Sequence, residues 1–310
     1  MTPAFLISRR AEAFDAVGGG FLTRLSSPFD VLLTGVALMH LAASQGHLGM
    51  PTFLLQNGAR ANAMDDLGET PPHSAIAISK NYDVCRVLLE HGGDLWNCNA
   101  DGQTPLHTFP NQASEQILLN YECLLDLSVC DNRGMSMLHY LVWSSKTSSE
   151  MFHRFYERSS SSLETVDAEG RSMLHLATQR GNVLVVACLL DAAKNVDGQR
   201  RDPPGRTVLY YGVENERAPE TITVLVTYGI NMRARDCHKR SVLHHAAKLG
   251  NLSALKVLLA LGMTDELRVA DHLGMSPLQI AVSHDSHAVR LFLAEARSFV
   301  ARPYYKRVQV

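Results

Sequence analysis

This 310-residue sequence lacks several features that mark membrane proteins, secreted domains and common enzymes. It has no run of about 18 apolar residues, so we expect no membrane span. No continuous apolar segment follows Arg9-Arg10, which argues against a signal peptide. It contains no phosphate-binding glycine loop and no Gly-x-Ser-x-Gly nucleophile elbow. None of its six cysteines forms a Cys-x-x-Cys pair, and we expect reduced, buried thiols in a cytoplasmic or nuclear protein.

The sequence also lacks an excess of charge of either sign. Lys and Arg total 29 and Asp and Glu total 31, which gives a net charge of −2. This balance predicts no general attraction to nucleic acids or membrane surfaces. Charged residues make up 19% of the chain and hydrophobic residues 46%, a composition that favours a folded chain over a disordered one.

What the sequence does contain is a short phrase that returns every 32 to 36 residues. The phrase reads Asp, two variable residues, Gly, one variable residue, Thr or Ser, a variable residue that is sometimes Pro, Leu and His. Clear copies are Thr104-Pro105-Leu106-His107 and Gly170-Arg171-Ser172-Met173-Leu174-His175. The last position of the phrase is occupied in turn by His40, His73, His107, His139, His175, Tyr210, His244 and Gln279.

Each letter of the phrase has a physical reason. The Thr or Ser is suited to cap a helix by accepting from its first free N–H groups. Pro in the first helical turn loses nothing, because its missing N–H would have no helical partner. The Gly of the phrase allows a positive φ in a tight turn. The sequence therefore predicts one tight tip and one helix start per repeat.

The period and the Thr-Pro-Leu-His phrase resemble the ankyrin-repeat family. This resemblance implies an all-α solenoid of helix-turn-helix repeats with β-hairpin-like tips, in which the recurring His bonds backbone groups. We expect an N-terminal cap or partial repeat at 1–34, about eight repeats at 35–296 and a basic tail at 297–310. The end repeats are expected to be atypical because one face of each meets water.

Some repeats are more regular than others. We expect outer helices at 183–190 and 252–261, where apolar residues fall at helical spacing. Phe109-Pro110 predicts that the inner helix after His107 stops early or kinks. Lys239 replaces the tip Gly of its repeat, which predicts strain or another turn type there.

The candidates for chemistry are better explained by structure. His238 and His272 hold variable tip positions in successive repeats and could approach each other, but no third ligand for a metal is evident. The tip aspartates recur once per repeat, so we expect them to serve the turn rather than catalysis. We therefore predict no catalytic residue, no metal and no cofactor. The tip aspartates are Asp65, Asp131, Asp167, Asp202, Asp236 and Asp271.

The position just after the tip Gly, here called the ladder position, carries Arg in three consecutive repeats. The ladder residues are Glu69, Gln103, Met135, Arg171, Arg206, Arg240 and Met275. Asp66, Leu67, Glu69 and Asp101 make the early tips acidic or neutral, and the later tips are basic. The predicted partner-binding residues are Arg133, Met135, Arg171, Arg180, Arg206, His238, Arg240, Lys248, Leu249 and Met275.

The family resemblance implies a protein-interaction module or scaffold that binds a protein partner through its concave groove. The arginines suggest an acidic segment, because guanidinium pairs bidentately with carboxylate. We expect a monomer that binds neither nucleic acid nor membrane. One alternative is an enzyme or small-molecule receptor with a pocket at the irregular middle repeats, around 109–145 or 199–211. Another is an interaction segment of a larger regulator.

Overall fold

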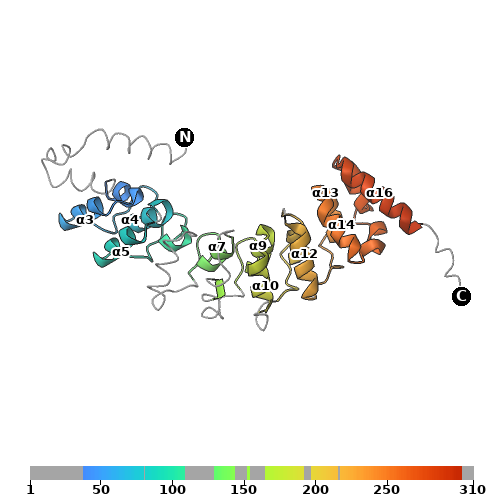
Figure 1. Ribbon diagram of the computed structural model, residues 1–310, viewed down its shortest axis with the longest axis horizontal. Coiled ribbons are helices and arrows are strands. Elements are labelled where there is room, and N and C mark those ends of the chain that lie inside the picture. The colour runs from blue at the N-terminus through green and yellow to red at the C-terminus, as the bar shows by residue number, and fades with distance from the viewer. Residues whose placement is uncertain are drawn as a thin grey trace. The chain divides into compact units, whose positions relative to one another are not determined.

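The computed structural model describes residues 38–79, 81–108, 129–143, 152–153, 165–191, 197–215 and 217–301 (Figure 1). The chain divides into two compact units, residues 1–141 and 142–310. The predicted N-terminal cap at 1–34 and most of the irregular middle, at 109–128 and 144–151, lie outside the described residues.

Unit 1 contains short helices in pairs. Residues 38–45 are helical and precede α3 (Gly49–Gln56). The next repeat has α4 (Pro71–Ser74), which continues as a π-helical turn, η2 (Ala75–Ser79), and then α5 (Tyr82–Glu90). In the third, a single 3₁₀ turn, η3 (Pro105–Thr108), stands where an inner helix was expected. Phe109-Pro110, where that helix was predicted to stop or kink, lies outside the described residues. The last helix of this part is α7 (Met137–Trp143), which runs into unit 2.

The described residues after 164 in unit 2 form four helix pairs. Its inner helices are α9 (Met173–Arg180), α11 (Val208–Gly212), α13 (Val242–Leu249) and α15 (Pro277–Ser283). Its outer helices are α10 (Val183–Asp191), α12 (Ala218–Thr227), α14 (Leu252–Ala260) and α16 (His287–Ala301), with the 3₁₀ helix η5 (Met263–Arg268) after α14. The two predicted outer helices are confirmed to within one residue at each end, and α16 continues past residue 296, where the array was expected to end.

The helices of unit 2 form two layers (Figure 1). Inner helices pack on inner helices, α9 on α11, α11 on α13 and α13 on α15, while α10, α12 and α14 pack in the same order on the outer side. Leu, Val and Ala from both layers make the core, for example Leu174, Val186, Leu243 and Leu255, each fully buried. Each repeat thus buries its apolar face against its neighbours, as stacked repeats must.

The cysteines divide into two groups. Cys85 is buried as expected, and burial raises the pKa of its thiol to about 12. Cys98, Cys130 and Cys237 are exposed near the tips, so the expectation of uniformly buried thiols is wrong for these three. Within the described ranges, no helix is both long and apolar enough to cross a membrane.

Candidate functional site

The tips are held by one carboxylate or amide oxygen each. In every described tip the Oδ1 atom of the first residue accepts the backbone N–H of the ladder residue four positions on, at 2.6–2.9 Å. In most tips the same oxygen also accepts the N–H two positions on, at 2.8–3.0 Å. The tip aspartates therefore serve the turn as predicted, since each replaces water for one or two backbone amides.

Two tips depart from this pattern in ways the sequence explains. Asn99, not Asp101, takes the capping position of its tip, and its Oδ1 accepts from Asp101 and Gln103. The amide oxygen of Asn accepts the same hydrogen bonds as a carboxylate oxygen. The repeat phrase was defined with Asp at this position and therefore did not identify Asn99. In the tip that begins at Asp202, Pro204 has no N–H to offer, and only the Arg206 amide is bonded.

The backbone carbonyl of several ladder residues accepts a hydrogen bond from the preceding repeat. His40 Nε2 donates to the Glu69 carbonyl at 2.8 Å, His73 Nε2 to Gln103 at 3.0 Å and His244 Nε2 to Met275 at 3.1 Å. Tyr210, which replaces His, places its hydroxyl to donate to the carbonyls of Arg240 and Ala234. The backbone of Glu69, Gln103, Arg240 and Met275 is thus fixed by two repeats, which pre-organises these four side chains for binding.

Histidines at this position of the repeat also cap the inner helices. Nδ1 of His73, His175 and His244 accepts the backbone N–H and the hydroxyl of the Thr or Ser three residues earlier, a capping box with His in place of Glu or Gln. These bonds fix the neutral tautomer that carries its proton on Nε2. Burial lowers the pKa of these rings, for His175 to about 4.

The last repeat carries Gln279 at this position. Gln279 Oε1 accepts from the N–H and the hydroxyl of Ser276 at 2.8 and 2.9 Å, so the cap is kept. The side chain of Gln279 is exposed, and no further repeat follows in the described part of the chain. Gln279 thus keeps the capping role of the His, and the expectation that the end repeats are atypical stays a prediction.

The three ladder arginines pair with their own tip aspartates. The Nε atoms of Arg171, Arg206 and Arg240 donate to Oδ2 of the aspartate four residues earlier at 2.7, 2.7 and 2.9 Å. Each aspartate is almost fully buried, and each arginine is part-exposed. One carboxylate thus binds the turn with Oδ1 and the guanidinium with Oδ2, so the arginines are part of the turn as well as of its surface.

A second network links three inner helices beside the ladder. Glu214 accepts from Gln179 Nε2 and from His245 Nε2, each at 2.9 Å, and Arg206 Nη1 lies 3.9 Å from the same carboxylate. Burial alone would raise the pKa of Glu214, but these hydrogen bonds and the charges of His245 and Arg206 outweigh it and lower that pKa. Tyr211 donates to Asp202 Oδ2 and accepts from Arg206 Nη2.

The other predicted binding residues lie in different settings. Arg133, His238, Lys248 and Leu249 are exposed, and Met275 is part-exposed. Arg180 is exposed and lies over the Trp143 ring, 3.5 Å from its centre. Met135 is only 8% exposed, so the expectation that it offers an apolar side chain to a partner is corrected: it belongs to the core.

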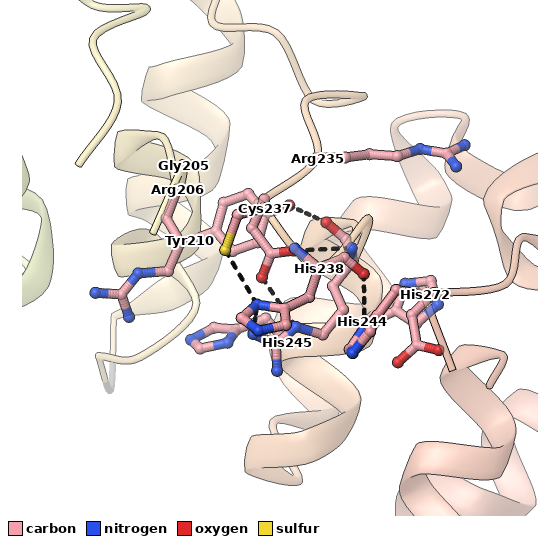
Figure 2. Close-up of polar contacts among 12 residues, drawn as sticks. Gly205, Arg206, Tyr210, Arg235, Cys237, His238, His244, His245 and His272 are labelled. Atoms are coloured by element: carbon pink, nitrogen blue, oxygen red, sulfur yellow. Dashed lines mark hydrogen bonds and ion pairs between the residues drawn. The ribbon is translucent and has the colours of Figure 1, made fainter. Parts of the chain in front are cut away.

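The predicted approach of His238 and His272 is confirmed (Figure 2). Their ring centres lie 4.8 Å apart, and the exposed Cys237 thiol lies 3.1 Å from His238 Nδ1. Figure 2 shows Cys237 and His238 in the middle of a cluster, with Tyr210 on one side and His272 on the other. Among the described residues, no group of three or more His, Cys, Asp or Glu side chains could hold a metal ion.

The middle of the chain was an alternative location for a pocket. Residues 109–128 and 144–151 lie outside the described residues, so a pocket in that part of the chain stays a prediction. In the second proposed stretch, Tyr210 and Tyr211 are each 1% exposed and their hydroxyls are bonded to protein atoms. These two large side chains are packed inside the repeat.

Comparison with known proteins agrees with this geometry. A sequence model of the family described as ankyrin repeats matches residues 39–109, 138–236 and 217–302. The chain is 34% identical to human Rabankyrin-5 over 167 residues, which is 53% of this chain and 14% of that protein. It is 25% identical to the mouse B-cell lymphoma 3 protein homolog over 249 residues, 79% of this chain and 48% of that protein. A putative ankyrin repeat protein of Rickettsia bellii is 44% identical over 57 residues.

These relatives are longer than the matched region. The chain spans 14% of the length of the human and mouse Rabankyrin-5 proteins, with 34% and 33% identity. The similarity therefore concerns the repeats and not the other parts of those proteins.

Proposed function

The chain belongs to the ankyrin-repeat family, whose repeats are protein-interaction modules, and we propose that it binds a protein partner through the tips and inner helices of unit 2. The observation that carries this proposal is the double fixation of the ladder backbone. The tip aspartate holds the N–H of Arg240 and the preceding repeat holds its carbonyl. A surface whose backbone is already ordered loses little entropy when it binds, which favours recognition.

The tips also form a continuous row. In unit 2 the Cys237 N–H donates to the Pro204 carbonyl and the His272 N–H donates to the His238 carbonyl, each at 2.9 Å. A partner that crosses several tips would therefore meet side chains at a fixed spacing. We propose an acidic segment as the partner, aligned with Arg171, Arg206 and Arg240. Single exposed ion pairs contribute about 0.2–1 kcal/mol, so the arginines would set register while apolar contacts supply most of the affinity.

The site proposed here comprises the exposed and part-exposed members of the predicted set. In unit 2 they are Arg171, Arg180, Arg206, His238, Arg240, Lys248, Leu249 and Met275. Arg133 belongs to unit 1 and stays a separate prediction. We place the partner in the cytoplasm or nucleus, where the exposed thiols Cys98, Cys130 and Cys237 would stay reduced.

Affinity capture from source-cell extract with the whole chain tests the proposal. The variant with Arg171, Arg206 and Arg240 all changed to Gln is the suitable comparison. Glu would put a second carboxylate beside each buried aspartate, whereas Gln removes the charge and can still donate to Oδ2. We expect the wild type to capture a protein that the variant captures at least about fivefold less, at equal helicity by circular dichroism. Equal capture by both chains would contradict the proposed site.

A further inference from the structure

The three ladder arginines differ in the partner that each has besides its tip aspartate. This difference decides how much of the positive charge of each arginine is balanced by nearby carboxylates. Arg171 Nη2 pairs with Glu169 at 2.6 Å, and Arg206 lies between Tyr211 and the Glu214 carboxylate. Arg240 Nη2 instead contacts the Nδ1 atom of His238 at 3.2 Å. A neutral ring nitrogen accepts this hydrogen bond without cancelling charge. Arg240 is therefore the ladder arginine whose charge is balanced by one carboxylate alone, that of Asp236.

The tip residues next to Arg240 add positive charge and no acid. Lys239 is exposed and precedes it, and the exposed Lys248 lies at the end of α13. Neither lysine forms an ion pair with any residue that the structure describes. The tip residues 237–240 and 272–275 contain no Asp or Glu. The carboxylates below them are buried: Asp236 binds Arg240, and Asp271 accepts the N–H groups of Leu273 and Met275.

Apolar side chains stand beside these cations. Leu273 is 73% exposed on the next tip, Leu249 is 48% exposed next to Lys248, and Met275 is part-exposed at the ladder position. The two tips are joined, because both the N–H and Nδ1 of His272 contact the His238 carbonyl at 2.9 and 3.1 Å (Figure 2). The last two tips thus present aliphatic and cationic side chains on one tied surface.

We infer that this surface, the last-tip surface made of Lys239, Arg240, Leu273 and Met275, binds a peptide segment in which Asp or Glu stands next to a large apolar residue. The inference rests on the proposed function and narrows it: of the three ladder arginines, Arg240 contributes most to recognition of the acidic partner. Pairing of a carboxylate with guanidinium and ammonium sets the register, and burial of Leu273 and Met275 supplies affinity.

The test uses a phage-displayed library of random short peptides, selected on the purified whole chain. We expect enriched peptides that combine Asp or Glu with Leu, Ile, Phe or Trp. Synthetic copies should bind about tenfold more weakly to the Lys239→Gly/Arg240→Gln variant, as measured by fluorescence anisotropy. Lys239→Gly keeps the left-handed turn, since Lys239 has a φ of 58°, so the variant removes charge and not the tip.

Two control variants make the result specific. Leu273→Ser should weaken the same peptides, and Arg171→Gln, which has the same ladder position but two acidic neighbours, should change binding less than about twofold. Enrichment of neutral or basic peptides, equal losses for Arg171→Gln and the double variant, or no enriched peptide at all would each overturn the inference. None of these results bears on capture of a whole protein partner, so the proposed function is tested separately by the capture experiment.

Discussion

At the scale of single residues, the recurring histidine caps its helix through Nδ1, and this role requires a neutral ring because a protonated Nδ1 cannot accept. In the repeat of His175, Nδ1 accepts from Ser172, and the ring lies edge-on to Tyr211 with 5.1 Å between centres. Burial lowers the pKa of His175 from an ordinary 6.5 to about 4. In the unfolded chain the ring takes up a proton as the pH falls below 6.5, while the folded chain resists until about 4. Stability is therefore complete above this window and is lost as pH falls through it.

Replacement of His175 by Gln tests this linkage. Gln279 shows that Gln can keep the cap in this chain, and Gln does not titrate. We expect the free energy of unfolding of the wild type to fall by up to about 3 kcal/mol more than that of His175→Gln between neutral pH and pH 4. Urea titrations at a series of pH values measure the difference. Parallel pH profiles for the two proteins would show that His175 has the same pKa in the folded and the unfolded state, and would contradict this account.

Tyr210 tests the bridging job of the same position. Its hydroxyl donates to the Ala234 and Arg240 carbonyls of the next repeat. Tyr210→Phe leaves these carbonyls without that donor in a buried place, and we expect a loss of about 1–3 kcal/mol in urea unfolding. Tyr210→His should lose less, because His244 makes the equivalent bond to Met275. A Phe variant as stable as the wild type would contradict the bridging role.

At the scale of elements, the tips are defined by one left-handed residue each. Lys239 takes this conformation with a φ of 58°, where the neighbouring tip has Gly274 at 76°. Lys239→Gly should stabilise unit 2 by about 1 kcal/mol, because a side chain is strained in this region. Gly274→Ala should cost a similar amount, since open space surrounds the position of its Cβ and only backbone strain opposes it. Thermal unfolding of both variants measures these opposite shifts, and a destabilised Lys239→Gly would contradict the argument.

The tip that contains Gly170 allows backbone strain to be distinguished from a steric clash. At Gly170 a Cβ atom would lie 2.5 Å from Pro203 Cδ of the next tip. Gly170→Ala therefore adds a clash to the strain of its φ of 75°, and it should destabilise more than Gly274→Ala. The two alanine variants share the same change in side chain, so any difference between them reports the contact with Pro203.

Much of this element structure could be predicted from the sequence, and the exceptions have physical reasons. The period, the capping residues and the outer helices after Gly181-Asn182 and Gly250-Asn251 follow from local chemistry and spacing. The Asp–Arg pairs could also have been predicted, since Asp and Arg are four residues apart in three repeats. The burial of Met135 could not, because a ladder side chain points to water or to the core according to its neighbours.

The candidate site was predictable in position but not in charge. The spacing placed Arg171, Arg206 and Arg240 at equivalent tips, and the structure agrees. Their second partners come from elsewhere in the fold: Glu214 follows α11 and lies against Arg206, and His238 turns its Nδ1 to Arg240. The periodic pattern shows which residues share a register, and it does not show which of them keep a free charge.

At the scale of the whole molecule, a near-neutral net charge hides local differences. Asp66 and Asp101 are exposed on tips of unit 1, and Lys239 and Lys248 are exposed in unit 2. Each unit therefore presents its own kind of surface to a partner. Long-range attraction to the last-tip surface should weaken as salt rises, because exposed charges are screened over about 8–10 Å at physiological ionic strength.

The central claim is that partners bind at the tips and inner helices of unit 2 and not at its outer helices. Site-specific photo-crosslinking in cell extract tests it most directly. A photoreactive residue would replace Leu273 on a tip, or Leu184 on α10 or Leu291 on α16, which are 63% and 51% exposed. We expect a crosslinked protein from position 273 and none from the two outer-helix positions. Crosslinks of equal yield from α10 or α16, or none from position 273, would contradict the account.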